Sequence, residues 1–227
     1  MNKNFSMKLR SPAKIFTKIL DVIYPQNCPI CGREAEIQSL CEHCAKAYIN
    51  GHRSFVSQIE YNGRTLKVFA IDIFNKETAK IIHNLKYDSI KANAADIFRF
   101  GLTNFYDFLS KADLVTFIPL HPLRFLRRGY NQAAVLAKIA GAELDISCQR
   151  TMFRKRYNVT QTKKNAQKRK SAVVNLFGML KKADVTDKTI ILVDDVCTTG
   201  STIGECADIL YKAGAKEVIL LVLAKVS

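Results

Sequence analysis

The sequence predicts an α/β protein in which a mainly parallel sheet flanked by helices follows a small metal-binding module. Two observations support this class. From Tyr61 onward, short apolar runs rich in β-formers alternate with helical patterns, which implies right-handed βαβ units. Before them, four cysteines lie within seventeen residues. We therefore expect three parts in the 227-residue chain: a basic amphipathic helix (1–23), a cysteine module (24–60) and a large domain (61–227).

The N-terminal segment is basic and has helical spacing. Its apolar residues follow the i, i+3, i+4, i+7 pattern: Phe16, Ile19, Leu20 and Ile23. Lys14 and Lys18 interrupt any continuous apolar stretch, so we expect no signal peptide. The helix either docks on its own domain or associates weakly with the anionic inner face of a membrane. The longest apolar run, Val218–Ala224, is too short to span a bilayer.

The cysteine module has metal-site spacing. Cys28, Cys31, Cys41 and Cys44 form the pattern C-x2-C-x9-C-x2-C. Two such pairs can hold zinc in a closed tetrahedron of thiolates, which predicts a structural site with no open position. An iron–sulfur cluster or redox thiols are the alternatives, and His43 is a candidate replacement ligand. An odd total of seven cysteines favours a reducing, cytoplasmic setting.

The large domain alternates predicted strands and helices. We expect strands at 66–74, 114–120, 189–193 and 217–224, and helices at 77–87, 94–109, 131–140 and 202–213. In sheets of this kind, ligands bind beyond the carboxyl ends of the strands.

One strand end carries the residues of an anion site. The apolar run from Thr189 ends in Asp194 and Asp195 and then turns through Thr-Thr-Gly-Ser-Thr into a helix. Backbone N–H groups at such a helix start favour an anion, and the hydroxyls can donate to phosphate oxygens. The adjacent carboxylates are suited to a polyol or a hard cation. This turn predicts a pocket for a phosphorylated sugar.

The run VDDVCTTGST resembles the phosphoribosyl pyrophosphate (PRPP) signature of the type I phosphoribosyltransferases, and the cysteine module narrows the resemblance to the ComF family, which includes GntX-type members. The resemblance implies a type I phosphoribosyltransferase-like fold that binds PRPP with magnesium. Asp194 and Asp195 would then hold the ribose hydroxyls, and residues 198–202 the 5-phosphate. The implied PRPP-binding residues are Asp194, Asp195, Val196, Cys197, Thr198, Thr199, Gly200, Ser201 and Thr202.

Three other stretches are similar to the family. Residues 119–132, with R-G-Y-N-Q at their end, look like its pyrophosphate loop, represented by Pro119, Leu120, His121, Arg124, Arg127 and Arg128. The run 84–87 looks like its L-K-Y helix end, and the spacing of Gln161, Arg169 and Phe177 like its Q…R…F run.

Positive charge is concentrated in the middle of the chain. The net charge is +15, and residues 124–182 hold fifteen Lys or Arg against two acidic residues. This excess indicates an anionic partner. Single-stranded nucleic acid is one candidate, because aromatic residues are interleaved with the basic ones: Phe125, Tyr130, Phe153 and Tyr157. Each aromatic can equally be a core residue, which we favour for Phe125 and Phe153. The expected nucleic-acid or lid residues are Arg154, Arg156, Gln161, Lys168 and Arg169.

Two functions follow from this interpretation. The ComF resemblance implies a cytoplasmic protein that binds PRPP and handles single-stranded DNA during DNA uptake and natural transformation, with partners in the uptake machinery. The alternative is an active phosphoribosyltransferase that acts on an unidentified acceptor in salvage or nutrient use, without DNA binding. The sequence offers no compelling general base, so we assign no catalytic residue.

Overall fold

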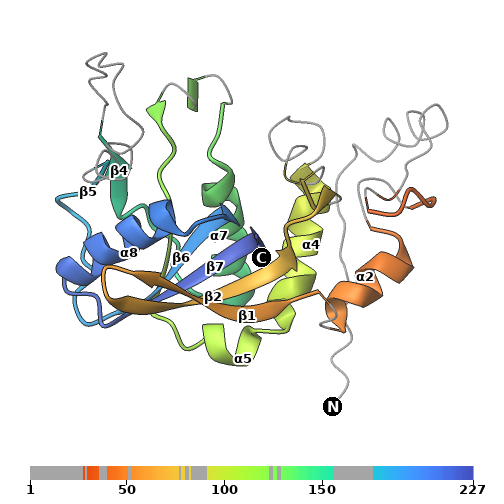
Figure 1. The fold of residues 1–227 in the computed structure, drawn as a ribbon, viewed down its shortest axis with the longest axis horizontal. Coiled ribbons are helices and arrows are strands. Elements are labelled where there is room, and N and C mark those ends of the chain that lie inside the picture. Colours follow the sequence, from red (N-terminus) through yellow and green to blue (C-terminus); the bar gives the residue numbers. More distant parts are fainter. Residues whose placement is uncertain are drawn as a thin grey trace.

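The computed structural model describes most of the large domain and part of the cysteine module (Figure 1). The described residues are 28, 30–35, 40–50, 53–76, 78–79, 82, 91–122, 125–126, 129–155 and 176–226. The predicted helix at 1–23, the run 84–87 and most of the predicted helix at 77–87 lie outside them.

A five-stranded sheet forms the centre of the large domain, with the strand order β1-β2-β7-β6-β3. The β2–β7, β7–β6 and β6–β3 pairs are parallel and the β1–β2 pair is antiparallel, so the predicted mainly parallel sheet is confirmed. The strand bounds are β1 (Phe55–Tyr61), β2 (Arg64–Ile73), β3 (Leu114–Phe117), β6 (Thr189–Cys197) and β7 (Glu217–Lys225).

Strand β1 is absent from the sequence-based prediction. It pairs with β2 along its whole length through a two-residue turn at Asn62 and Gly63, both of which have positive φ. An Asn-Gly turn of this geometry is typical of a tight hairpin, a local signal that the sequence contains. The large sheet therefore begins at Phe55 and takes in residues that the sequence analysis places in the cysteine module.

Helices cover both faces of the sheet, and strand alternation divides the core accordingly (Figure 1). On β2, Phe69 and Ile71 face the core that contains α4 and α7, whereas Val68 and Ala70 face the core that contains α8. The α8 face also receives the small β4–β5 pair. These elements are α4 (Lys91–Thr103), α5 (Tyr106–Leu109), α7 (Gln132–Leu144), α8 (Ser201–Lys212), β4 (Met152–Arg154) and β5 (Phe177–Met179).

Several predicted elements have different ends in the structure. The strand expected at 114–120 ends at Phe117, two residues before Pro119, which has no N–H to donate to a ladder. The predicted helix at 94–109 is two helices, α4 and α5. Strand β6 continues past its expected end at Val193 to Cys197, because its pairing with β7 carries on through Asp194 and Val196.

The cysteine module packs directly on the large domain. Helix α2 (Glu42–Ile49) lies beside α4 (Figure 1). Cys28, Cys41 and Cys44 are buried in the same hydrophobic cluster as Ile97 and Phe98 of α4. The module therefore shares a core with the large domain.

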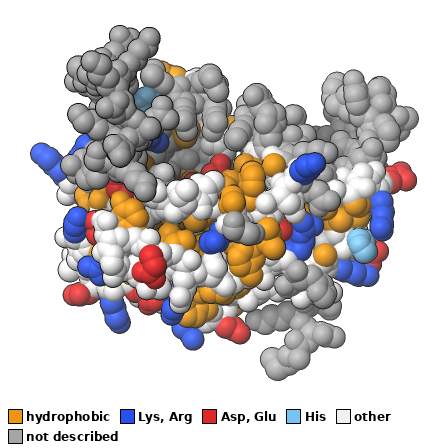
Figure 2. Space-filling view, viewed as in Figure 1, with side chains coloured by type: hydrophobic (Ala, Val, Ile, Leu, Met, Phe, Trp, Pro, Cys, Tyr) orange, Lys and Arg blue, Asp and Glu red, His pale blue; other side chains and the backbone are white. Residues whose placement is uncertain are grey.

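The surface over β1 and β2 is apolar in its middle and charged at its sides (Figure 2). Val56 of β1 is 54% exposed. Phe108 of α5 stacks on Phe69, and the Lys67 ammonium lies 5.3 Å from the Phe108 ring centroid. Exposed apolar side chains such as Val56 and Phe108 are ordinary on a globular surface. None of the helices described by the structure is long and apolar enough to cross a membrane.

Candidate functional site

The turn from β6 into α8 lines a cavity of about 470 Å³ at the carboxyl edge of the sheet. All nine residues from Asp194 to Thr202 contribute to it. The opposite wall comes from the loop after β3, and Arg154 of β4 adds a cation. The position agrees with the general rule for ligand sites in open parallel sheets.

Residues 198–202, called the phosphate loop here, present the start of α8 to this cavity. Gly200 is the N-cap residue, with φ of 76°, and no side chain caps the helix. The Gly204 N–H donates to the Gly200 carbonyl at 2.7 Å, and the hydroxyls of Thr199 and Ser201 lie 3.0 Å apart. The first-turn N–H groups and the helix dipole favour an anion here.

Strand β1 holds the phosphate loop by close packing. A Cβ on Gly200 would lie 2.7 Å from Ile59 Cδ1, and a Cβ on Gly204 would lie 2.4 Å from the Tyr61 ring. Real Cβ atoms do not approach other atoms this closely, and Gly200 also has a φ that other residues adopt only with strain. Gly204 therefore requires glycine because no space is left for a side chain, and Gly200 favours glycine because of its backbone conformation.

At the end of β6, the charged form of the Asp194 carboxyl is disfavoured by its surroundings. The Asp195 N–H donates to Asp194 Oδ1 at 2.9 Å, and the Val196 N–H donates to Asp195 Oδ1 at 2.8 Å. Burial and the neighbouring charge of Asp195 raise the pKa of the Asp194 carboxyl well above its ordinary value. Hydroxyl donors or a hard cation would stabilise the charged carboxylate.

The opposite wall contains two polar residues that the sequence analysis quotes in a motif but does not select. The Asn131 side chain donates to the Ile118 carbonyl at 2.9 Å and accepts from Ala133 N–H at 3.1 Å, which caps α7. Gln132 is 2% exposed, and its Nε2 has no hydrogen-bond partner among the described residues. Both residues line the cavity, and Gln132 has donor capacity to offer a ligand.

The structure brings together part of the predicted site. Pro119, Leu120 and Arg154 line the same cavity as the nine residues of the β6–α8 turn. His121 is described but does not line it. Six lining residues carry no motif signal and are found only in the structure: Phe74, Ala79, Ile82, Ile118, Ala133 and Ile203. Seven predicted residues lie outside the described residues: Arg124, Arg127, Arg128, Arg156, Gln161, Lys168 and Arg169.

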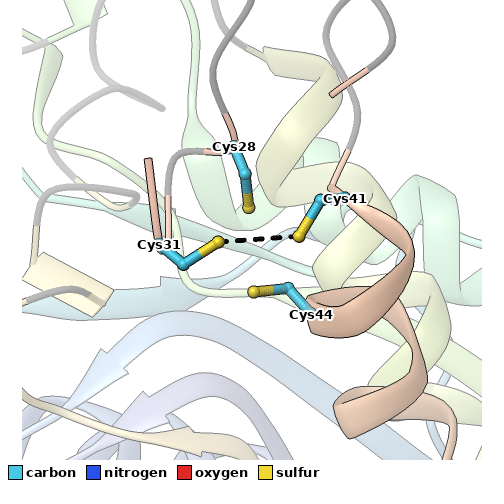
Figure 3. A group of neighbouring side chains, drawn as sticks. All are labelled: Cys28, Cys31, Cys41 and Cys44. Carbon is cyan, nitrogen blue, oxygen red and sulfur yellow. Dashed lines mark hydrogen bonds between the residues drawn. The ribbon is translucent and has the colours of Figure 1, made fainter. Parts of the chain in front are cut away.

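The four cysteines of the module converge on one point (Figure 3). Their sulfur atoms all lie within 4.8 Å of one another, and Cys31 Sγ and Cys41 Sγ are 3.5 Å apart. A tetrahedral zinc ion with Zn–S bonds of about 2.3 Å places its sulfurs roughly 3.8 Å apart, so the cluster fits zinc. Four thiolates fill the tetrahedron, which makes the site structural.

The electrostatics of this cluster suit a cation. Burial alone would raise the pKa of the Cys28 thiol, but nearby backbone N–H groups lower it to about 7. Burial and the neighbouring cysteines raise the pKa of Cys44. Four thiolates at this separation repel one another, and a divalent cation removes that repulsion.

Comparison with known families identifies both parts of the chain. Residues 126–227 match the phosphoribosyl transferase domain, and residues 19–54 match the double zinc ribbon domain. With the strand order and the cysteine cluster, these matches confirm the predicted fold class and the structural zinc site.

The chain is also similar to curated bacterial proteins. It is 36% identical over 110 residues to competence protein F of Haemophilus influenzae, covering 48% of each chain. It is 26% identical over 200 residues to DNA utilization protein YhgH of Escherichia coli K12, covering 84% of this chain and 86% of that protein. It is 29% identical over 210 residues to competence protein ComFC of Streptococcus pneumoniae, covering 85% and 78%.

Among solved structures, the chain is similar to a purine phosphoribosyltransferase from Pyrococcus horikoshii, with 18% identity and a TM-score of 0.37 over 58% of this chain and 83% of that chain. The fold assignment rests on the family matches and the observed topology.

Replacing one zinc ligand should release the metal and destabilise the whole chain. Because Cys41 belongs to the core shared with α4, we expect Cys41→Ser to lose zinc and to lower the melting temperature by at least roughly 2 °C, which corresponds to about 1 kcal/mol in a chain of this size. Elemental analysis and a thermal melt measure both quantities. The control is Cys148→Ser, which replaces a half-buried cysteine outside the cluster. Retention of zinc by Cys41→Ser would contradict the assignment.

Removing the charge of Asp194 should stabilise the empty protein, and more so at high pH. The pKa of Asp194 is raised in the native state. The protein therefore has its full free energy of unfolding at low pH, where Asp194 is protonated, and loses part of it as pH rises through that pKa. We expect Asp194→Asn to raise the melting temperature by roughly 2–4 °C at pH 8 and by less at pH 5. The exposed Asp107→Asn is the control. An equal shift of Asp194→Asn at both pH values would exclude this explanation.

Proposed function

Because the chain belongs to the ComF family of proteins with a phosphoribosyltransferase-like domain, we propose that it binds PRPP, or a related sugar phosphate, together with magnesium and handles single-stranded DNA during DNA uptake. The observation that carries the first part is the cavity at the β6–α8 turn, where a single run of nine residues supplies both an anion site and an acid pair.

Each wall of this cavity suits one part of PRPP. The phosphate loop would hold the 5-phosphate through the N–H groups at the start of α8. Asp194 and Asp195 would accept hydrogen bonds from the ribose hydroxyls. The pyrophosphate would extend toward Pro119 and Leu120. Magnesium would neutralise charge between the pyrophosphate and the protein, and oxygen-rich ligands of this kind are the ones it prefers.

The acid pair supplies the acidic side chains among the described residues of this lining. Apart from Asp194 and Asp195, the lining residues that the structure describes include no aspartate, glutamate or histidine. His121, a base candidate by type, does not line the cavity. Transfer to an acceptor needs a base or an intrinsically reactive nucleophile; we assign no residue to that role and propose ligand binding.

The DNA part of the proposal is supported by the relatives and by charge. Similar proteins of Haemophilus influenzae and Streptococcus pneumoniae are named competence proteins, and those of Escherichia coli are named for DNA utilization. Residues 150–182 contain eleven Lys or Arg and no acidic residue, an excess that attracts the phosphates of a nucleic acid.

PRPP binding should require magnesium and Asp195. We expect Asp195→Ala to weaken binding at least tenfold, because a carboxylate is lost from the wall that would hold the diol. Calorimetric titration of PRPP, ribose 5-phosphate and pyrophosphate, each with and without magnesium, measures this. Asp107→Ala, which removes an exposed carboxylate on α5, serves as the control. Equal PRPP affinity in wild type and Asp195→Ala would overturn the proposed site.

Single-stranded DNA binding should depend on the basic segment 150–182 and on salt. Neutral substitutions at Arg154, Arg156, Lys168 and Arg169 should weaken binding, and the salt dependence should become shallower as phosphate contacts are lost. Gel shifts over a salt series test this. The control neutralises four basic residues elsewhere: Lys46, Lys111, Lys212 and Lys216. Binding that changes neither with these four substitutions nor with salt would argue against the DNA role.

A further inference from the structure

A second cavity of about 370 Å³ lies beside the loop that joins β3 to α7. It shares Pro119, Leu120 and Asn131 with the first cavity, but none of the β6–α8 turn. Its size is within the range of cavities that hold small ligands. Nothing in the proposed sugar-phosphate site uses it.

Aromatic side chains form one part of its lining. Phe117, Phe125 and Tyr130 all contribute. Phe125 is 49% exposed, so its interpretation as a core residue is wrong. Its backbone is held in a helical turn, since Phe125 N–H donates to the His121 carbonyl at 2.9 Å and Gly129 N–H donates to the Phe125 carbonyl at 2.7 Å. An aromatic ring that is presented to solvent from a hydrogen-bonded backbone is a suitable stacking platform.

The lining also contains two cationic side chains. Lys138 projects from α7, and Arg150 lies just before β4. The Arg150 side chain is oriented by a hydrogen bond from its Nε to the Met152 carbonyl at 3.1 Å. This bond uses one of the five N–H donors of the guanidinium group. None of the described lining residues is acidic, so the cavity is charge-complementary to a phosphate.

We propose that this second cavity is a nucleotide site, in which Phe125 stacks on a base and Lys138 and Arg150 meet the adjoining phosphate. The inference deepens the proposed DNA role and rests on it: the occupant is a nucleotide unit of single-stranded DNA. Base stacking beside cations is the usual means of sequence-tolerant single-strand recognition. The two cavities differ in chemistry, because the acid pair lines only the first.

The absence of tryptophan from the chain allows a direct test of stacking. Phe125→Trp introduces the chain's single tryptophan into the cavity, and Tyr106→Trp places one at a site of similar exposure on α5. An oligothymidylate should quench the emission of Phe125→Trp and leave that of Tyr106→Trp unchanged. Thymidine monophosphate, titrated in parallel, shows whether a free nucleotide is sufficient. Equal quenching of both variants, or of neither, would overturn the proposal.

Affinity measurements separate stacking from apolar packing. By fluorescence anisotropy with a labelled oligothymidylate, we expect Phe125→Leu to bind about tenfold more weakly, because the aromatic face is lost while apolar bulk is retained. Phe125→Tyr should bind as wild type does. Lys138→Gln should weaken binding and lower the salt slope, whereas Lys111→Gln should not.

These outcomes distinguish failure of the second site from failure of the proposed function. Oligothymidylate binding by wild type that Phe125→Leu leaves intact would overturn the nucleotide site and leave the DNA role standing. A wild-type protein that binds no oligonucleotide would overturn both. Magnesium-dependent PRPP binding should be unchanged in Lys138→Gln, because Lys138 lies on α7 and does not line the first cavity.

Discussion

The close contact between strand β1 and the phosphate loop is the constraint on which the candidate site depends. Ile59 packs against Gly200, and Tyr61 packs so tightly against Gly204 that no Cβ fits there. This contact sets the position of the start of α8, and therefore where its N–H groups converge. In the sheet, β2 and β7 separate β1 from β6, and helix α8 bridges this distance because it contacts β1, β7 and β6.

In the proposed sugar-phosphate site, the acid pair would exchange stability of the empty protein for binding capacity. Strand β6 continues through Asp194 and Asp195, which places two carboxylates side by side at the edge of a buried sheet. The raised pKa of Asp194 shows that this arrangement has a free-energy cost, because it disfavours the charged form of the carboxyl. A ligand that supplies hydroxyl donors or a cation recovers part of that cost on binding. Strain of this kind is common where structure serves a ligand.

The cysteine module and the loop after β3 connect the site to the rest of the molecule. Zinc would hold Cys28, Cys41 and Cys44 in the core that also contains α4, so metal loss is expected to affect more than the module. The loop after β3 provides a wall for both cavities. Both polar atoms of the Asn131 side-chain amide in this wall are hydrogen-bonded. A sugar phosphate and a nucleotide could thus be held on the two sides of one wall.

The sequence alone determined the features that depend on local spacing: the zinc ligands, the alternation of strands and helices, and the run from Asp194 to Thr202. Their chemistry is carried by residues that are near one another in the chain. Only the tertiary structure decided that β1 joins the sheet, that β6 extends to Cys197, that Gln132 faces the first cavity and that Phe125 lies exposed in a second. The local Asn-Gly signal predicts the turn between β1 and β2, but strand ends and cavities depend on contacts between segments far apart in sequence, which local propensity does not determine.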